Sequence, residues 1–126
     1  MNTRRKKTVL IVDDVSESLR SLKAVLKDRY AIRLAKSGAL ADLILDTVNI
    51  DLILLDIEMP EVSGLEYARR LKSNPVTWHI PIIFVSVHSA AEVVQSAGQL
   101  DIGGFIKKPA NPGLIIEKVD SILASA

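Results

Sequence analysis

Cysteine is absent from the 126-residue sequence, and its absence excludes several kinds of site. A chain without thiols has no disulfide framework, no cysteine-ligated metal and no thiol redox chemistry. The composition fits a reducing compartment, and we expect a cytoplasmic protein. An excess of one charge is missing as well, because 16 basic and 15 acidic residues leave a net charge of +1. We therefore expect no direct binding to nucleic acid and no attraction to a membrane surface.

Long hydrophobic runs are also missing, and no segment approaches the length that spans a membrane. Basic residues at positions 4–7 precede an apolar run at 9–12, which is too short for the core of a signal peptide. We interpret residues 1–7 as a solvated basic arm and residues 8–124 as a single domain. With 48% hydrophobic residues, a domain of this size can bury a sizeable core without disulfides.

The sequence does contain an alternation of short apolar runs and helical patterns. The runs are flat, which is typical of parallel strands buried on both faces. They lie at residues 9–12, 52–55 and 80–85, with weaker candidates at 31–35 and 104–106. Apolar residues at helical spacing lie between and after them, namely Val15, Leu19, Leu22 and Leu26, then Leu40, Leu43 and Ile44, then Leu65, Ala68 and Leu71, and last Ile115, Val119 and Ile122.

Helix start signals support this division of the chain. Two of them have the capping-box pattern of a serine followed three residues later by glutamate, and the third is an asparagine before a proline. They are Ser63 with Glu66, Ser89 with Glu92, and Asn111 with Pro112.

Five β-α units predict an α/β domain of three layers. The expected architecture is a doubly wound, flavodoxin-like (βα)5 domain, with a parallel five-stranded sheet in the order 2-1-3-4-5 and helices on both faces. Ligands of such sheets bind beyond the carboxyl ends of the strands, where the strand order switches. Asp13 and Asp14 follow the first run and Asp56 follows the third. Because three carboxylates so close together would repel one another, we expect a divalent cation, and Mg²⁺ suits an oxygen-ligand site of this kind.

Each of these residues also has an ordinary structural interpretation. A pair such as Asp13 and Asp14 is more often a turn or helix cap than a metal site. Ser86 at a strand end commonly bonds to the backbone, and an isolated Lys108 is commonly solvated. The argument depends on their conjunction, because acids, a hydroxyl and a lysine before proline all end strands at one edge of the sheet.

The ordered set of motifs resembles the receiver domains of two-component response regulators. The resemblance covers about residues 8–124, and its matching stretches are Ile11–Asp14, Leu55–Pro60 followed by Gly64, Phe84–Ser86 and Phe105–Pro109. A receiver of this kind is a signalling phosphoacceptor that catalyses its own phosphorylation and dephosphorylation, and it is not an enzyme acting on an external substrate.

The resemblance implies a role for each residue at this edge. Asp56 would accept a phosphoryl group from a histidine kinase or a histidine phosphotransfer protein, as a mixed anhydride. Mg²⁺, for which Mn²⁺ can substitute, would be held by Asp13, Asp14, Asp56 and the backbone carbonyl of Glu58. Ser86 and Lys108 would contact phosphoryl oxygens. Lys107 is an open alternative to Lys108, although the resemblance favours Lys108 before a cis Pro109.

Phosphorylation is expected to change the face formed by the fourth helix, the fifth strand and the fifth helix. In this expectation Ser86 moves toward the phosphate and Phe105 rotates inward, while plain core packing of Phe105 is the alternative. The same face is a possible homodimer interface. Glu58, Val87 and His88 are expected to control access to the phosphoryl group, and Val87 replaces the alanine or glycine usual in the family.

Some features depart from the family pattern or leave the context open. The stretch Asp101–Gly104 differs from the usual Gly-Ala-x-Asp and puts the rotation of Phe105 in doubt. The sequence from Ile11–Asp14 through Lys72–Pro75 resembles receivers joined to cyclic-dinucleotide enzymes. We expect either a stand-alone receiver or the amino-terminal piece of a longer chain, acting through a C-terminal output domain or a downstream protein. Two other functions stay open, namely a pseudo-receiver acting as a constitutive interaction module and a small Mg²⁺-dependent hydrolase.

Overall fold

A parallel sheet in the order β2-β1-β3-β4-β5 organises the fold, as the sequence predicts. The structure is a computed structural model that describes residues 6–89, 92, 95 and 103–124. The strands are β1 (Thr8–Val12), β2 (Ala31–Ala35), β3 (Leu52–Asp56), β4 (Ile82–Ser86) and β5 (Gly104–Lys107). The helices are α1 (Ser16–Leu26), α2 (Gly38–Thr47), α3 (Gly64–Ser73) and α5 (Pro112–Leu123).

Some sequence-based expectations fall outside the described residues. They are most of the basic arm at residues 1–7, the body of the expected fourth helix, and Asp101 and Ile102 of the loop before β5.

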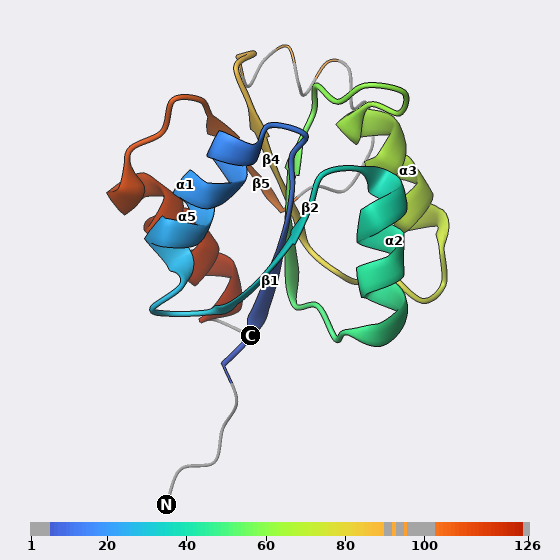
Figure 1. The fold of residues 1–126 in the computed structure, drawn as a ribbon, viewed down its shortest axis with the longest axis horizontal. Coiled ribbons are helices and arrows are strands. Elements are labelled where there is room, and N and C mark those ends of the chain that lie inside the picture. The colour runs from blue at the N-terminus through green and yellow to red at the C-terminus, as the bar shows by residue number, and fades with distance from the viewer. Residues whose placement is uncertain (1–5, 90–91, 93–94, 96–102, 125–126) are drawn as a thin grey trace, which may run out of the picture.

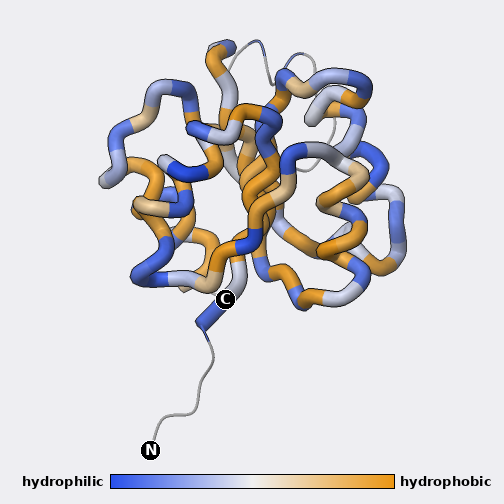
Figure 2. Tube along the Cα trace, in the orientation of Figure 1, coloured by the Kyte–Doolittle hydropathy of each residue, from blue (hydrophilic) through white to orange (hydrophobic). Residues whose placement is uncertain are grey.

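The helices cover both faces of the sheet, which gives the three expected layers. Figure 1 shows α1 and α5 on one face and α2 and α3 on the other. Each face has its own apolar cluster, one containing Leu19, Leu26 and Val119 and the other containing Ala41 and Tyr67. Figure 2 shows the hydrophobic residues concentrated along the central strands between these layers.

The three central strands are buried along their whole length, which confirms the interpretation of flat apolar runs. All residues of β1, β3 and β4 are buried, whereas β2 and β5 at the sheet edges are partly exposed. A strand covered by helices on both faces needs apolar side chains at every position, and a large apolar side chain contributes about 1.5–3 kcal/mol when fully buried. The polar residue at the end of such a strand is therefore conspicuous.

The helix start signals are confirmed. The hydroxyl of Ser63 accepts a hydrogen bond from the Glu66 N–H, and Asn111 Oδ1 accepts one from the Leu114 N–H at 2.7 Å. Ser89 and Glu92 form the reciprocal pair of a capping box, with distances of 3.2 and 3.3 Å.

The apolar spacing of Leu40, Leu43 and Ile44 predicts the helix α2 but does not coincide with its buried side. Leu40 and Leu43 are 47% and 64% exposed, whereas Ala41 is buried and Ile44 and Leu45 pack against the core only in part. The sequence of α2 is apolar on nearly all sides, so its spacing does not specify which side faces the sheet. The small Ala41 is the residue of α2 that is fully buried.

Two smaller corrections concern the ends of the outer helices. Val15 is 48% exposed because it is the extended N-cap residue before α1 and not part of the helix. In α5 the last core residue is Leu123, while Ile122 is only partly buried.

A cluster at the amino-terminal edge of the sheet joins α1 to α5. The Arg29 guanidinium and the Tyr30 hydroxyl, both just before β2, donate hydrogen bonds to the Asp120 carboxylate. Burial, together with the bond to Asp120, raises the pKa of Tyr30 to about 12. Because β1 begins at this edge and α5 ends there, both ends of the described chain lie on the side opposite the carboxyl ends of the strands (Figure 1).

None of the helices in the described ranges has both the length and the apolar character needed to cross a bilayer.

Candidate functional site

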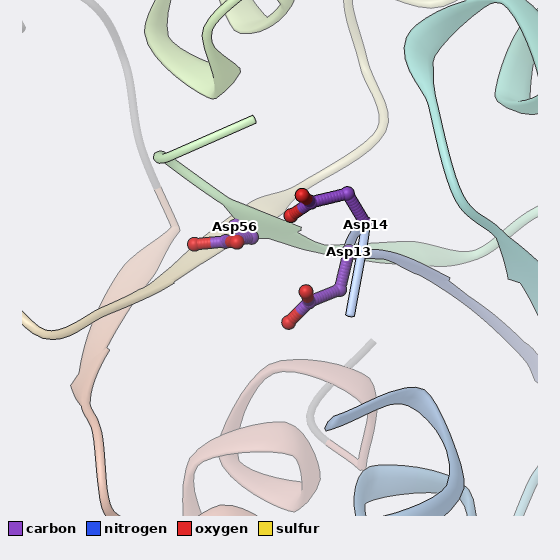
Figure 3. A group of neighbouring side chains, drawn as sticks. All are labelled: Asp13, Asp14 and Asp56. Atoms are coloured by element: carbon purple, nitrogen blue, oxygen red, sulfur yellow. The ribbon is translucent and has the colours of Figure 1, made fainter. Parts of the chain in front are cut away.

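Three aspartates meet where β1 and β3 end. The two strands are paired in parallel register, with Val12 opposite Leu55, so Asp13 and Asp56 follow at neighbouring positions. Carboxylate oxygens of Asp13, Asp14 and Asp56 all lie within 4.8 Å of one another. Figure 3 shows the three side chains gathered at this edge. The sequence-based prediction that the fold brings these acids together is confirmed.

Asp13 combines a structural contact with a place in the cluster. Its side chain is almost fully buried, and its Oδ1 accepts a hydrogen bond from the Val15 N–H at 2.9 Å, which is the turn role suggested by the ordinary interpretation. Its Oδ2 accepts a bond from Lys108 Nζ at 2.8 Å. The two interpretations of this residue are therefore compatible, because the turn fixes the carboxylate that faces the cluster.

Lys108, and not Lys107, lies at the acidic cluster. Its ammonium group is 2.8 Å from Asp13 Oδ2 and 3.9 Å from Asp56 Oδ2. Lys107 is exposed and lies opposite Ser86 in the strand register. The Lys108–Pro109 peptide bond is cis, as expected.

Ser86 is completely buried at the end of β4. Its hydroxyl oxygen accepts a hydrogen bond from the His88 N–H at 3.1 Å, and its carbonyl accepts one from the Lys108 N–H at 2.7 Å. The backbone role considered from the sequence is therefore present. A hydroxyl that accepts a hydrogen bond still has its own proton to donate.

The electrostatics of the cluster favour a bound cation. Burial raises the pKa of Asp56, and the neighbouring Asp13 carboxylate raises it further. Lys108 and the Glu58 N–H lower it, Asp14 raises it, and the result is a pKa of about 6. Three carboxylates face one ammonium group, so negative charge is left uncompensated. An all-oxygen donor set with excess negative charge matches the preference of Mg²⁺.

A hollow of about 660 Å³ lies beside the acids. Glu58, Glu92 and His88 are on its rim, and His88 bridges the other two, with Nε2 2.6 Å from Glu58 and Nδ1 3.1 Å from Glu92. The hydrogen bond that His88 donates to the Glu58 carboxylate raises the pKa of His88. All three side chains are about half exposed, so these ion pairs add little stability.

A family model described as "Response regulator receiver domain" matches residues 9–120. The chain belongs to this family.

Similar proteins include both multidomain and single-domain examples. A probable cyclic di-GMP phosphodiesterase from Vibrio cholerae serotype O1 is 40% identical over 116 residues, which are 92% of this chain and 26% of that protein. The chemotaxis protein CheY from Pseudomonas aeruginosa is 28% identical, with 90% of this chain matched to 94% of that protein. The solved receiver domain of a signal transduction histidine kinase from Syntrophus aciditrophicus has a TM-score of 0.84 at 30% identity, covering 95% of this chain and 92% of that one. The receiver domain thus spans about a quarter of the phosphodiesterase.

Neither Val87 nor Phe105 lines the hollow beside the acids. Val87 is 55% exposed and lines a second hollow, between α1 and the connection from β5 to α5, and not the one bordered by Glu58 and His88. Phe105 is partly buried and packs against the cluster on the α2 and α3 face. The expected roles of both residues stay predictions.

Sequence reasoning did not identify the second contact of Glu92. The capping-box spacing correctly placed Glu92 in the first turn after Ser89, but the same carboxylate also meets His88. The sequence signal for it was the spacing of four residues between His88 and Glu92, which brings side chains together on a helical turn.

Proposed function

We propose that this receiver domain is a phosphorylation-dependent switch in which Asp56 accepts a phosphoryl group. The donor is a phosphohistidine of a histidine kinase or of a histidine phosphotransfer protein. The observation that supports this most is the position of the Asp56 carboxylate, at the sheet edge between two further acids and the Lys108 ammonium group. The proposed location is the cytoplasm, and a fused or separate output protein would read the switch.

The transfer itself requires little from the protein beyond positioning and charge. A carboxylate oxygen of Asp56 attacks phosphorus, an oxygen–phosphorus bond forms as the nitrogen–phosphorus bond breaks, and the electron pair returns to the imidazole of the donor. No general base is needed, because a carboxylate with a pKa of about 6 is already ionised at neutral pH. This explains why a nucleophile–histidine pair is not required at the site.

The residues at the site fit a divalent ion. Asp13, Asp14, Asp56 and the backbone carbonyl of Glu58 would hold Mg²⁺ or Mn²⁺. When bound, the ion neutralises the charge on the phosphoryl oxygens during transfer.

Lys108 and Ser86 are the proposed contacts of the phosphoryl group. Lys108 pairs with Asp13 in this structure, and its flexible stem allows it to turn to a phosphoryl oxygen near Asp56. Ser86 would donate its hydroxyl proton to another oxygen. Shifting a conformer from about 1% to about 99% occupancy takes about 5.5 kcal/mol. Charge-assisted hydrogen bonds of about 1.5–3 kcal/mol each are of the right size.

The proposed output surface includes β5 and α5 together with the fourth helix, whose body lies outside the described residues. Phe105 on β5 would couple Ser86 to this surface, and the surface is also the proposed site of any homodimer. The similarity to a cyclic di-GMP phosphodiesterase suggests an enzyme of that class as one possible output, joined to the receiver domain or downstream of it.

Incubation with Mg²⁺ and acetyl phosphate, followed by intact-protein mass spectrometry, tests the proposal. We expect one phosphoryl group per chain, which is released by hydroxylamine and absent from an Asp56→Asn variant. An unmodified wild-type protein would instead support a pseudo-receiver. Continuous hydrolysis of external phosphomonoesters would support the hydrolase. A parallel incubation without Mg²⁺ separates the metal requirement from the choice of residue.

A further inference from the structure

The first residue of α3, Gly64, lies directly against the backbone of the proposed phosphoacceptor, Asp56. The Gly64 N–H donates a hydrogen bond to the Ile57 carbonyl at 2.8 Å. A Cβ atom added to Gly64 would overlap the Asp56 carbonyl oxygen, and it would lie 2.8 Å from both the Asp56 carbonyl carbon and the Ile57 Cα. All of these are backbone atoms of the acceptor segment, so no side chain can move aside to make room.

Among the glycines in the described ranges, only Gly64 would place a Cβ less than 3.0 Å from backbone atoms. The nearest case is Gly103, where a Cβ would lie 3.1 Å from the Ile82 carbonyl oxygen. Gly38 has the matching position in α2, directly after an N-cap serine, but an added Cβ would meet the edge of the Tyr67 ring at 3.0 Å. In α5, a Cβ on Gly113 would come no closer than 3.4 Å to the Asn111 side chain. A glycine is therefore not a general requirement at the start of these helices, and the backbone contact distinguishes Gly64.

The segment that Gly64 touches positions two functional groups together. The Glu58 N–H donates a hydrogen bond to Asp56 Oδ1 at 3.2 Å. This bond fixes the acceptor carboxylate to the backbone two residues further along the chain. The carbonyl of that same residue is a proposed metal ligand. A displacement of the Asp56–Ile57 peptide would move the carboxylate and this carbonyl relative to Asp13 and Lys108.

The loop from Ile57 to Gly64 has little freedom to absorb such a displacement. The Val62 N–H bonds to the Pro60 carbonyl at 2.8 Å, and Glu61 has a positive φ of 71° in this tight turn. The loop is therefore closed both at its tip and at its base. β4 holds the other side of the segment, because Asp56 is paired with Val85 in the sheet.

We propose that Gly64 is a positioning residue for the phosphoacceptor. The missing side chain lets α3 approach until it fixes the Asp56–Ile57 peptide, which sets the carboxylate relative to Asp13 and Lys108. The inference rests on the proposed function, because its effect is on phosphoryl transfer and metal binding.

The test compares Gly64→Ala with Gly38→Ala and Gly113→Ala. Each variant is assayed for the phosphorylation rate constant with acetyl phosphate, for Mg²⁺ affinity by calorimetry, and for urea stability. We expect Gly64→Ala to be phosphorylated about 100-fold more slowly, the loss that a small misplacement of a reacting group produces, and to bind Mg²⁺ more weakly. Gly38→Ala and Gly113→Ala are expected to stay close to the wild type in phosphorylation rate and in Mg²⁺ affinity, even if Gly38→Ala is less stable because its Cβ meets the Tyr67 ring.

The outcomes separate this inference from the proposed function. A folded Gly64→Ala protein that matches Gly38→Ala in rate and Mg²⁺ affinity would overturn the positioning role while leaving Asp56 as the acceptor. If Gly64→Ala stays unfolded even in sucrose, which favours compact states, the glycine serves the fold as a whole and the inference is also overturned. A wild-type protein that neither accepts phosphate nor binds Mg²⁺ would overturn the proposed function itself.

Discussion

The Asp56 carboxylate is expected to destabilise the metal-free fold at neutral pH, and Asp56→Asn tests this directly. Asparagine has nearly the same shape and keeps an oxygen that can accept the Glu58 N–H bond, but it carries no charge. The variant therefore removes the repulsion from Asp13 and the cost of burying an anion. We expect it to be more stable than the wild type in the absence of divalent ions.

The magnitude and its sign follow from the pKa of Asp56, which is raised from 3.8 to about 6, first by burial and then by Asp13. Between these pH values the native carboxyl group keeps its proton while the unfolded chain has released it. The native state then binds more protons, so the free energy of unfolding falls as the pH rises and the penalty is complete above about pH 7. At 1.36 kcal/mol per pKa unit, the penalty is about 3 kcal/mol.

Urea denaturation of both proteins in EDTA, at about pH 4 and about pH 8, measures the effect. We expect the two stabilities to be similar at the lower pH and to differ by about 2–3 kcal/mol at the higher pH. Replacing the exposed Asp28 by asparagine is the matched control for the change from carboxylate to amide. Adding Mg²⁺ should stabilise the wild type more than Asp56→Asn. A difference between the proteins that is the same at both pH values would refute the electrostatic explanation.

Three other variants test separate parts of the structure. Lys108→Met leaves the buried Asp13 carboxylate without its ion-pair partner, so we expect the free energy of unfolding to fall by about 3 kcal/mol in metal-free urea denaturation. A change under about 0.5 kcal/mol would contradict the pairing. Asn111→Ala removes the N-cap of α5 and is expected to cost about 1 kcal/mol, which a thermal melt would detect and an unchanged melting temperature would contradict. Val87→Ala is expected to shorten the lifetime of the phosphorylated form, because the branched side chain is predicted to hinder the access of water. Mass spectrometry follows this lifetime, and a value equal to that of the wild type would count against the prediction. The experiment is informative because Val87 lines the hollow on the α1 side and not the one bordered by Glu58 and His88.

Much of the fold is readable from the sequence because the central strands are covered on both faces. Such strands must be apolar throughout, so β1, β3 and β4 appear as flat runs that end at a polar residue. The polar ends then identify the functional edge. The buried side of α2 could not be read in the same way, since a helix that is apolar nearly all round gives no preferred side, and the burial of Ala41 becomes visible only in the structure.

The functional site, too, could be predicted from the sequence only in part. The convergence of Asp13 and Asp56 follows from parallel strand order, which the sequence predicts. The choice between Lys107 and Lys108 depends on the chain direction after β5, and propensity and spacing do not specify it. The contact of Gly64 with the Asp56 peptide was hidden for another reason, because a glycine in a sequence does not reveal which atoms approach it.

The described residues begin and end at the amino-terminal edge of the sheet, at residues 6 and 124, and this has a practical consequence. An affinity tag or a fluorophore fused at either end is separated from the acids by the full length of the strands. Protein captured on a sensor surface through such a tag therefore presents Asp56 to the bulk solution. Donor proteins can then be tested for binding in solution flow without the attachment point blocking their approach.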